Sequence, residues 1–311
     1  MSVQCKEIQY NGYGRCLEMT NDVCRLVITL DKGPHIICFQ LHGEPNVMFE
    51  DAEDTTTHSG PEFDAYFYPG AAWHIYGGHR LWLSPESMPE TYYPDNDPVP
   101  YAVEGNTAVL SPAVQAGNQV QYVIRVTLSE NGGKAEVAHT IINRSSEEKT
   151  FAPWGLSVLA QGGVEIVPQA DKETGLLANR LLALWDYSDM ADDRVWWGTK
   201  YITLKQDPTA ETPFKLGLNH EKQWSCYQLG RELFVKRYHT VDGGNYPDGG
   251  CSFETYTCKN FLEMESLGEL VTLAPGESVD HVEYWEISAV EDSFDRKNEA
   301  SIAAFVEKHI R

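Results

Sequence analysis

Apolar and polar positions alternate most clearly in residues 120–128, where Val120, Ile124 and Leu128 fall on one side of an extended chain. This period of two is typical of a strand with one buried face. The alternation resumes in residues 135–141 after an Asn131-Gly132 pair, and an Asn-Gly turn between two such runs is a strong hairpin signal. We therefore predict that these two strands pair antiparallel.

Shorter runs of β-branched and aromatic residues predict further strands along the chain, because clusters of Gly, Pro and Asn separate them. A chain with many short strands is typical of a sandwich or a barrel, so we predict an all-β fold of large antiparallel sheets. The predicted strands cover residues 25–30, 36–41, 151–160, 201–205, 223–229, 233–238, 252–258, 261–267 and 279–287.

Two segments differ from this pattern. Residues 299–310 place Ile302, Phe305 and Ile310 on one stripe, which predicts a short C-terminal helix that docks on the sheets. Residues 55–100 intersperse prolines with aromatic and acidic residues without a sustained period, so we expect long ordered loops that wall a binding cleft. No repeat or flexible linker divides the chain, and we predict a single domain over residues 1–311.

Composition excludes several classes of protein. The 311 residues include 24 basic and 46 acidic side chains, and the formal net charge of -22 opposes binding to nucleic acid or to an anionic lipid surface. No apolar run approaches the roughly 20 residues of a membrane span. The first residues lack a secretory leader, so we expect a cytoplasmic protein, and the seven scattered cysteines predict reduced thiols and no metal site.

The first candidate site is residues 73–82, which combine tryptophans, histidines, paired glycines and an arginine. Adjacent glycines allow a close approach of the backbone to a ligand, while indole, imidazole and guanidinium groups give a sugar a stacking face and donors. The candidates are His74 and His79 for catalysis, and Tyr76, Arg80 and Trp82 for binding. Alternatively, the tryptophans and histidines are core residues. Zinc is disfavoured because no third ligand has a suitable spacing.

The second candidate site combines Glu254 with Glu263 and Glu265. Alternate residues of a strand share a face, so Glu263 and Glu265 point together. Glu254 lies among Phe253, Tyr256 and Cys258, where partial burial would raise its pKa toward neutrality and suit it to proton transfer. The alternative is that all three carboxylates lie on an exposed strand face of an acidic protein.

The remaining histidines are less informative. His139 is in phase with the apolar residues of its strand and is expected in the core, whereas His239 precedes a glycine-containing loop where it could meet a ligand. The sequence contains no serine-hydrolase elbow, phosphate-binding glycine loop or zinc-protease motif.

The order of several short motifs resembles the galactose mutarotase-like (aldose 1-epimerase) superfamily. The motifs are Asp31-Lys32-Gly33-Pro34-His35, Gly77-Gly78-His79-Arg80-Leu81-Trp82, Asn143-Arg144-Ser145 leading into Pro153-Trp154-Gly155, Phe253-Glu254-Thr255, Leu273-Ala274-Pro275-Gly276-Glu277 and His281-Val282-Glu283-Tyr284-Trp285. The resemblance implies a supersandwich of antiparallel sheets with a sugar cleft across one face.

The resemblance also implies an activity that needs no cofactor. Family mutarotases open the sugar ring with a carboxylate base and a histidine acid; Glu254 looks like the base, with Glu263 as its rival. His79 and Arg80 would bind the sugar or its phosphate. The family histidine is missing from residues 151–157, where Trp154 could instead stack on a sugar, so either His74, His79 or His239 supplies the proton or the reaction is lost.

Three functions are compatible with these residues and motifs. The first is a mutarotase or epimerase that acts on a small-molecule sugar, and the second is a non-catalytic carbohydrate-binding protein that keeps the cleft. The third, a glycoside hydrolase or lyase using Glu263 and Glu265, is disfavoured because such a pair must flank a glycosidic bond from two sides. The oligomeric state does not follow from the sequence.

Overall fold

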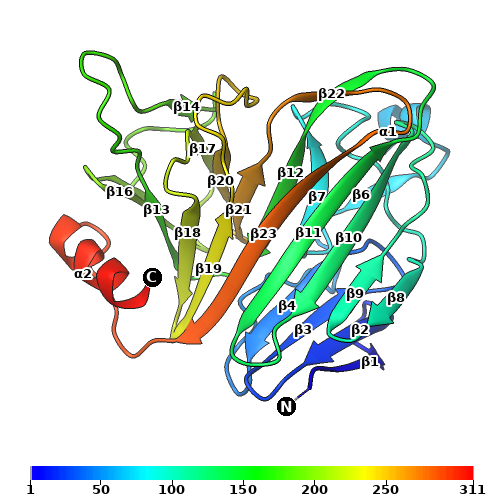
Figure 1. Ribbon diagram of the computed structural model, residues 1–311, viewed down its shortest axis with the longest axis horizontal. Coiled ribbons are helices and arrows are strands. Elements are labelled where there is room, and N and C mark those ends of the chain that lie inside the picture. The colour runs from blue at the N-terminus through cyan, green and yellow to red at the C-terminus, as the bar shows by residue number, and fades with distance from the viewer. Residues whose placement is uncertain (1, 311) are drawn as a thin grey trace.

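The computed structural model describes residues 2–310, and its two large antiparallel sheets pack against each other as layers (Figure 1). The first sheet has the order β1-β2-β3-β4-β7-β12-β21-β20-β17-β14, with β22 paired to the start of β12. Its strands are β1 (Gln4–Gln9), β2 (Arg15–Thr20), β3 (Cys24–Thr29), β4 (Ile36–Leu41), β7 (Gly78–Ser84), β12 (Lys149–Leu159), β14 (Leu182–Leu184), β17 (Phe214–Leu218), β20 (Phe253–Thr257), β21 (Leu262–Leu267) and β22 (Val271–Leu273).

The second sheet has the order β15-β16-β13-β18-β19-β23-β11-β10-β9-β8. Its strands are β8 (Tyr101–Glu104), β9 (Thr107–Leu110), β10 (Val120–Leu128), β11 (Lys134–Asn143), β13 (Val164–Pro168), β15 (Val195–Trp197), β16 (Tyr201–Lys205), β18 (Trp224–Leu229), β19 (Glu232–Tyr238) and β23 (Ser278–Ala289). A separate ribbon pairs β5 (Thr57–Ser59) with β6 (Ala72–His74), and α1 (Pro61–Tyr66) lies between them in sequence.

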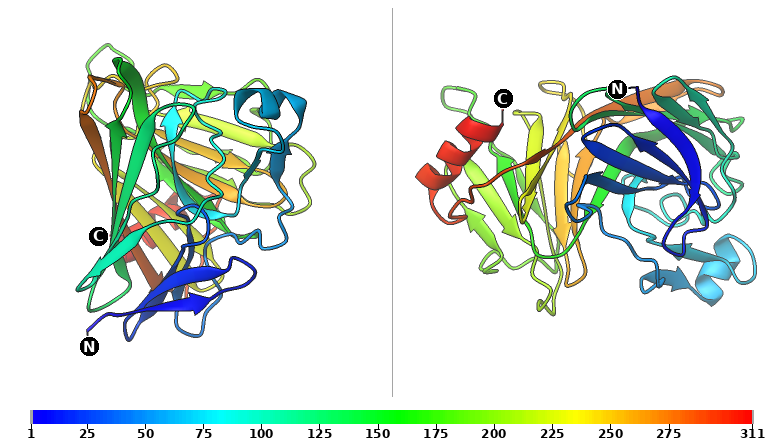
Figure 2. Two further views of the ribbon diagram at one scale, coloured as in Figure 1. Left: turned by 90° about the vertical axis from the view of Figure 1, so that its right-hand side faces the viewer. Right: turned by 90° about the horizontal axis from the view of Figure 1, so that it is seen from below.

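The predicted all-β sandwich with a short C-terminal helix is confirmed. Strands β10 and β11 pair antiparallel from Val120 opposite Asn143 to Leu128 opposite Ala135. The helix α2 (Glu299–His309) begins after Asn298, whose side chain accepts hydrogen bonds from the backbone of the first turn. Its buried residues Ile302 and Phe305 pack against residues of β13, β18 and β19. The helix lies on the side of the second sheet that faces away from the first, as Figure 2 shows from below.

The main core fills the space between the two sheets. Phe39 of the first sheet contacts Phe234 and Trp285 of the second, with ring centroids 6.1 and 5.8 Å apart. We call the side of the first sheet that faces this core its inner face, and the opposite side its outer face. Among residues 2–310, the structure contains no helix with the length and apolar character needed to cross a membrane.

The prediction that residues 55–100 are loops is wrong in part. This segment contributes β7, a strand in the middle of the first sheet between β4 and β12. All seven residues of β7 are buried, so its sequence lacks the alternation by which a half-buried strand is recognised. Gly77 and Gly78 have positive φ, and a Cβ on either would clash with the backbone of Phe49 or Ile36, so their close approach is to neighbouring chain segments.

Candidate functional site

A cleft lies on the outer face of the first sheet, and it consists of two adjoining cavities that share Glu86, Tyr92 and Trp154. The first, of about 210 Å³, contains Arg80 and Glu263, and we call it the arginine end. The second, of about 390 Å³, contains Glu254 and Asp248, and we call it the acidic end. Their combined size suits a small polar molecule with a ring.

Strand register explains why residues far apart in sequence meet in this cleft. Arg80 on β7 lies opposite Leu156 on β12, Leu156 lies opposite Glu265 on β21, and Glu265 lies opposite Glu254 on β20. Directly opposed residues of an antiparallel sheet point to the same face. One row across four strands therefore carries a guanidinium and two carboxyl groups on the outer face.

Arg80 forms the charged floor of the arginine end and is only 3% exposed. Its Nη2 donates a hydrogen bond to Glu263 Oε1 at 3.0 Å, and its guanidinium lies 4.2 Å from the ring centroid of Trp82. Its Nε and Nη1 are buried without a hydrogen-bond partner. Because an unpaired buried donor is costly, these two groups are available to a bound polar molecule.

Lys215 on β17 lines the arginine end and forms a second charged cluster with Glu254 and Glu265. Its Nζ lies 2.8 Å from Glu254 Oε2 and 3.0 Å from Glu265 Oε2. Trp154 Nε1 donates a further hydrogen bond to Glu265 Oε2 at 2.9 Å. Glu254 lines the cavity while its Oε1 has no hydrogen-bond partner, so this carboxyl keeps one free acceptor.

Burial controls protonation in this cluster. It raises the pKa of Glu254 and that of Glu265, although the Lys215 ammonium opposes the shift. Burial alone would lower the pKa of Lys215, but the two carboxylates outweigh burial and raise it. The carboxyls therefore retain a proton at a higher pH than ordinary glutamates, whereas the lysine stays charged. Glu254 is thus suited to donate or accept a proton near neutral pH.

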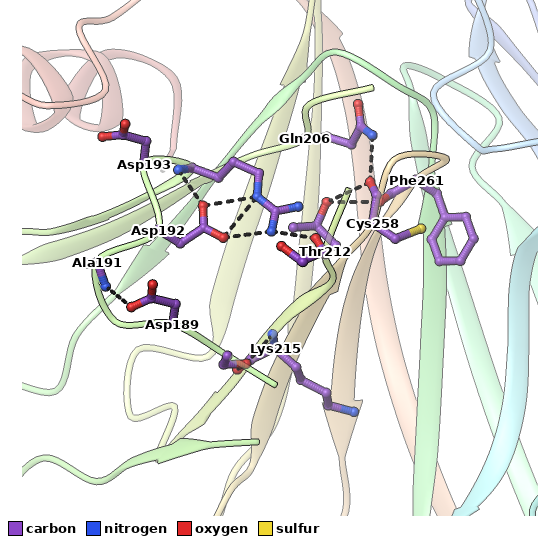
Figure 3. Close-up of polar contacts among 12 residues, drawn as sticks. Asp189, Ala191, Asp192, Asp193, Gln206, Thr212, Lys215, Cys258 and Phe261 are labelled. Atoms are coloured by element: carbon purple, nitrogen blue, oxygen red, sulfur yellow. Dashed lines mark hydrogen bonds and ion pairs between the residues drawn. The ribbon is translucent and has the colours of Figure 1, made fainter. Parts of the chain in front are cut away.

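Residues 185–194 connect β14 to β15 and fix both Lys215 and part of the cleft wall. Ser188 Oγ accepts a hydrogen bond from the backbone N–H of Lys215 at 2.8 Å and donates to its carbonyl at 2.6 Å. The turn is closed by an ion pair between Asp192 and Arg194 at 2.7 Å. Figure 3 shows this turn beside Lys215, whose side chain extends away from it. The same segment supplies Tyr187 to the arginine end and Trp185 to the acidic end.

His79 lies outside the cleft, which corrects the prediction that it acts beside Arg80. Neighbouring residues of a strand face opposite sides, so His79 points to the inner face. It is 1% exposed, with Nδ1 2.9 Å from Ser157 Oγ and Nε2 2.8 Å from His139 Nε2. His139 is accordingly a core residue, as expected.

The space between the inner face and the second sheet holds its own buried charges, which we call the inner-face network: His79 of the first sheet, and Lys236, Glu283, His139 and His281 of the second. Lys236 Nζ lies 2.8 Å from Glu283 Oε1 and donates to the carbonyls of Gly155 and Met264 at 3.0 Å. Burial lowers the pKa of each of the three histidines, which favours the neutral imidazole. A Cβ at Gly155 would lie 2.4 Å from Glu283 Oε1, so this glycine makes room for the carboxylate.

Three further predicted residues do not line the cleft. His74 Nδ1 lies 2.6 Å from Asp54 Oδ1, and the His74 ring stacks on Tyr76 with centroids 5.1 Å apart. The Tyr76 hydroxyl donates to Asn96 Oδ1 at 2.8 Å instead of facing a ligand. His239 is exposed after β19 and lies outside both cavities.

The cleft brings together most of the predicted groups and adds residues that the sequence pattern did not reveal. The predicted residues that line it are Arg80, Trp82, Trp154, Glu254 and Glu263. Glu265 does not line it, but it accepts hydrogen bonds from the lining residues Lys215 and Trp154. The missed residues are His58, Glu86, Tyr187, Lys215 and Asp248. A lysine within the apolar run Phe214–Leu218 was an available signal, because a buried lysine requires a partner.

The fold is that of galactose mutarotase-like and aldose 1-epimerase proteins, which confirms the resemblance at the level of architecture. A candidate aldose 1-epimerase from Klebsiella pneumoniae superposes with a TM-score of 0.59 at 10% identity, over 98% of this chain and 86% of that one. A galactose mutarotase-like protein from Lactobacillus casei gives 0.52 at 11% identity, over 88% and 100%.

One similar structure belongs to a longer protein. A TPR-domain-containing protein from Parabacteroides distasonis gives a TM-score of 0.59 at 14% identity, and the match covers 90% of this chain but 48% of that one. The present chain thus spans about half the length of that protein. No protein-family model and no curated protein matches the sequence. The solved structures therefore establish the fold, and the chemistry must be argued from the cleft.

Proposed function

We propose that this protein binds a monosaccharide in the cleft and interconverts its anomers or epimers by proton transfer, without a cofactor. The observation that carries the proposal is the buried carboxyl of Glu254, which lines the cleft, has a raised pKa and keeps a free oxygen. Aromatic rings beside it match the mixed apolar and polar surface of a sugar.

The two cleft carboxyls Glu254 and Glu263 are suited to opposite roles. They occupy diagonal positions on β20 and β21, where Cα atoms are about 7–8 Å apart. Glu263 accepts a hydrogen bond from Arg80 and is assigned the role of proton acceptor, whereas burial favours the protonated form of Glu254, which is assigned the role of donor. This assignment reverses the base role expected for Glu254 from the family resemblance.

In the proposed reaction, Glu263 accepts the proton of the anomeric hydroxyl while Glu254 donates a proton to the ring oxygen. The bond between the anomeric carbon and the ring oxygen then breaks, and an open-chain aldehyde forms. Rotation about the adjacent carbon–carbon bond and reversal of both transfers close the ring as the other anomer. Arg80 would donate hydrogen bonds to a sugar hydroxyl from Nε or Nη1, which have no protein partner.

The decisive experiment measures anomer interconversion by NMR exchange spectroscopy across a panel of aldoses. We expect catalysis above the buffer rate for at least one sugar, and a loss of about 100-fold or more in Glu254→Gln, because one proton-transfer group contributes about that much. Glu165→Gln is the matched control, since Glu165 is a buried carboxyl with a raised pKa on the second sheet, outside the cleft. If every sugar exchanges at the buffer rate, the catalytic proposal fails.

A non-catalytic sugar-binding protein is the second candidate. It is favoured because the histidine of the cleft, His58, lines the arginine end, whereas Glu254 lines the acidic end, so the two side chains do not share a cavity. The carboxylate–imidazole pair of the family mutarotases is therefore not reproduced at Glu254. This candidate predicts that calorimetry detects sugar binding, that Glu254→Gln largely preserves the affinity and that no variant changes anomer exchange.

A further inference from the structure

The acidic end of the cleft has an excess of carboxyl groups. Glu86, Asp248 and Glu254 line it, and they come from the segment after β7, the loop before β20 and β20 itself. Of the residues that the structure describes, no lysine or arginine lines this end, and the Nζ of Lys215 in the adjoining cavity is already shared between Glu254 Oε2 and Glu265 Oε2. Asp248 thus lines the cavity without an ion pair to Lys215, and Glu254 Oε1 is a buried oxygen without a hydrogen-bond partner.

The arginine end does not correct this imbalance. Arg80 pairs with Glu263 at 3.0 Å, so its charge is matched by a carboxylate of the same cavity. Across the whole cleft, Arg80 and Lys215 oppose the carboxyls of Glu86, Asp248, Glu254, Glu263 and the underlying Glu265. With Glu254 and Glu265 both protonated, the carboxylates of Glu86, Asp248 and Glu263 still outnumber the two cations Arg80 and Lys215, so the cleft repels an anionic substituent and attracts a cationic one.

The surroundings of the acidic end favour an organic ammonium group over a metal ion. Within residues 2–310, no cluster of three or more His, Cys, Asp or Glu side chains is placed to hold a metal ion. The acidic end is instead walled by the rings of Tyr92, Trp154 and Trp185. Aromatic faces combined with a carboxylate are the surroundings that recognise organic ammonium groups.

Glu254 supplies the evidence that this is a built site and more than an exposed acidic patch. Its side chain is 1% exposed, it lines the cavity and its Oε1 has no protein partner. Gly217 permits this placement, because a Cβ there would lie 3.3 Å from Glu254 Cγ and 2.6 Å from Cys251 Sγ. The fold thus holds a buried acceptor at the cavity wall beside two exposed carboxylates.

From these observations we infer that the acidic end is a subsite for an ammonium group, and that the substrate is an amino sugar rather than a phosphorylated or carboxylated one. The inference rests on the proposed function, because it assigns the substrate class of the same cleft. The ammonium substituent lies between Glu86 and Asp248 and donates hydrogen bonds to their carboxylates, while the sugar ring extends toward Glu254 and Arg80.

The test compares four probes by calorimetry on the full chain at low ionic strength: glucosamine, glucose, N-acetylglucosamine and glucose 6-phosphate. We expect glucosamine to bind at least about fivefold more tightly than glucose and the phosphate to bind most weakly, with the preference shrinking as salt is added. Galactosamine and galactose form a second pair. They repeat the comparison in case the cleft does not accept the ring configuration of glucose.

Variants locate the effect. The double variant Glu86→Gln/Asp248→Asn should bring the affinity ratio of glucosamine to glucose close to one. Glu90→Gln is the matched control, because Glu90 is an exposed glutamate of the same segment that does not line the cleft, and it should preserve the ratio.

The outcomes separate this inference from the function on which it rests. If neutral and amino sugars bind equally, or if the phosphate binds best, the ammonium subsite is refuted while a sugar cleft stands. If the double variant keeps the full preference, the subsite is not at the acidic end. If no sugar in either series binds, the proposed function itself fails.

Discussion

The outer face of the first sheet and the space between its inner face and the second sheet both bury charged side chains, but these two regions differ in how the charges are paired. In the space between the sheets, Lys236 and Glu283 pair at 2.8 Å, and every buried side-chain nitrogen and oxygen of the inner-face network has a hydrogen-bond partner. On the outer face, buried atoms of Arg80, Glu254 and Glu265 lack partners. Burial of a charge is therefore common to both regions, and the outer face differs by unpartnered polar atoms in residues beside the cleft.

The largest expected effect is on stability when the inner pair is broken. Lys236→Met leaves the Glu283 carboxylate buried without its cation, and we expect a loss of about 3–5 kcal/mol in the free energy of unfolding, measured in urea. Lys215→Met should cost less than half as much, because the carboxyls that it leaves can retain protons and adjoin the open cleft. Equal losses would show that the outer face is as dry as the inner one.

The pH dependence of stability sharpens the description of the interior. Burial lowers the pKa of His281 to about 3, below its unfolded value of about 6.5. Its contribution to stability is therefore present above about pH 6.5 and is lost as the pH falls. Between about pH 6 and 5 this loss makes the free energy of unfolding fall by up to about 1.4 kcal/mol per pH unit. His281→Gln should remove that part of the pH dependence.

Glu165 should give the opposite slope from the same interior. Burial raises its pKa to about 8, above its unfolded value of about 4.3, so its contribution is present below about pH 4.3 and is lost as the pH rises toward 8. Between about pH 5 and 7 the free energy of unfolding should fall by a similar amount per pH unit as the pH rises. Glu165→Gln should remove that part of the pH dependence. Urea unfolding of both variants over this range checks the two signs, and parallel profiles would contradict them.

The smallest expected effect concerns Trp154, which joins the two ends of the cleft. Trp154→Phe keeps a ring but removes the hydrogen bond from Nε1 to Glu265 Oε2, and we expect a stability loss of about 1 kcal/mol. Affinity for a bound sugar should fall by several-fold, because the wall of both cavities shifts. Unchanged affinity in calorimetry would place the sugar elsewhere.

The sequence predicted elements whose pattern is local. The β10–β11 hairpin and α2 follow from alternation, an Asn-Gly turn and an apolar stripe, all of which are visible within a few residues. Strands β7 and β17 were missed because both of their faces are buried, and a strand without a solvent side has no polar positions to reveal its period.

The sequence indicated several of the residues that line the cleft, but it did not indicate which face of the sheet each side chain occupies. Arg80 and Glu254 reach the cleft as expected, but the neighbouring His79 turns to the inner face because the strand places successive side chains on opposite sides. His79 and Arg80 can be assigned to opposite faces only when residues 78–84 are known to form a strand. That strand forms by pairing with β4 and β12, which the local sequence does not reveal. Lys215 joins the cleft only through contacts with residues distant in sequence, whereas Asp248 reaches it in the loop before β20.

The ion pair between Arg80 and Glu263 joins residues 183 positions apart. During synthesis from the N-terminus, β7 and β12 emerge long before β21, and β14 and β17 emerge before the two strands that connect them to the rest of the sheet. Until then the growing chain carries unpaired strand edges, which are prone to misassociation. The part of the first sheet that carries the cleft is therefore completed late on the ribosome, when β20 and β21 insert between segments that are already made.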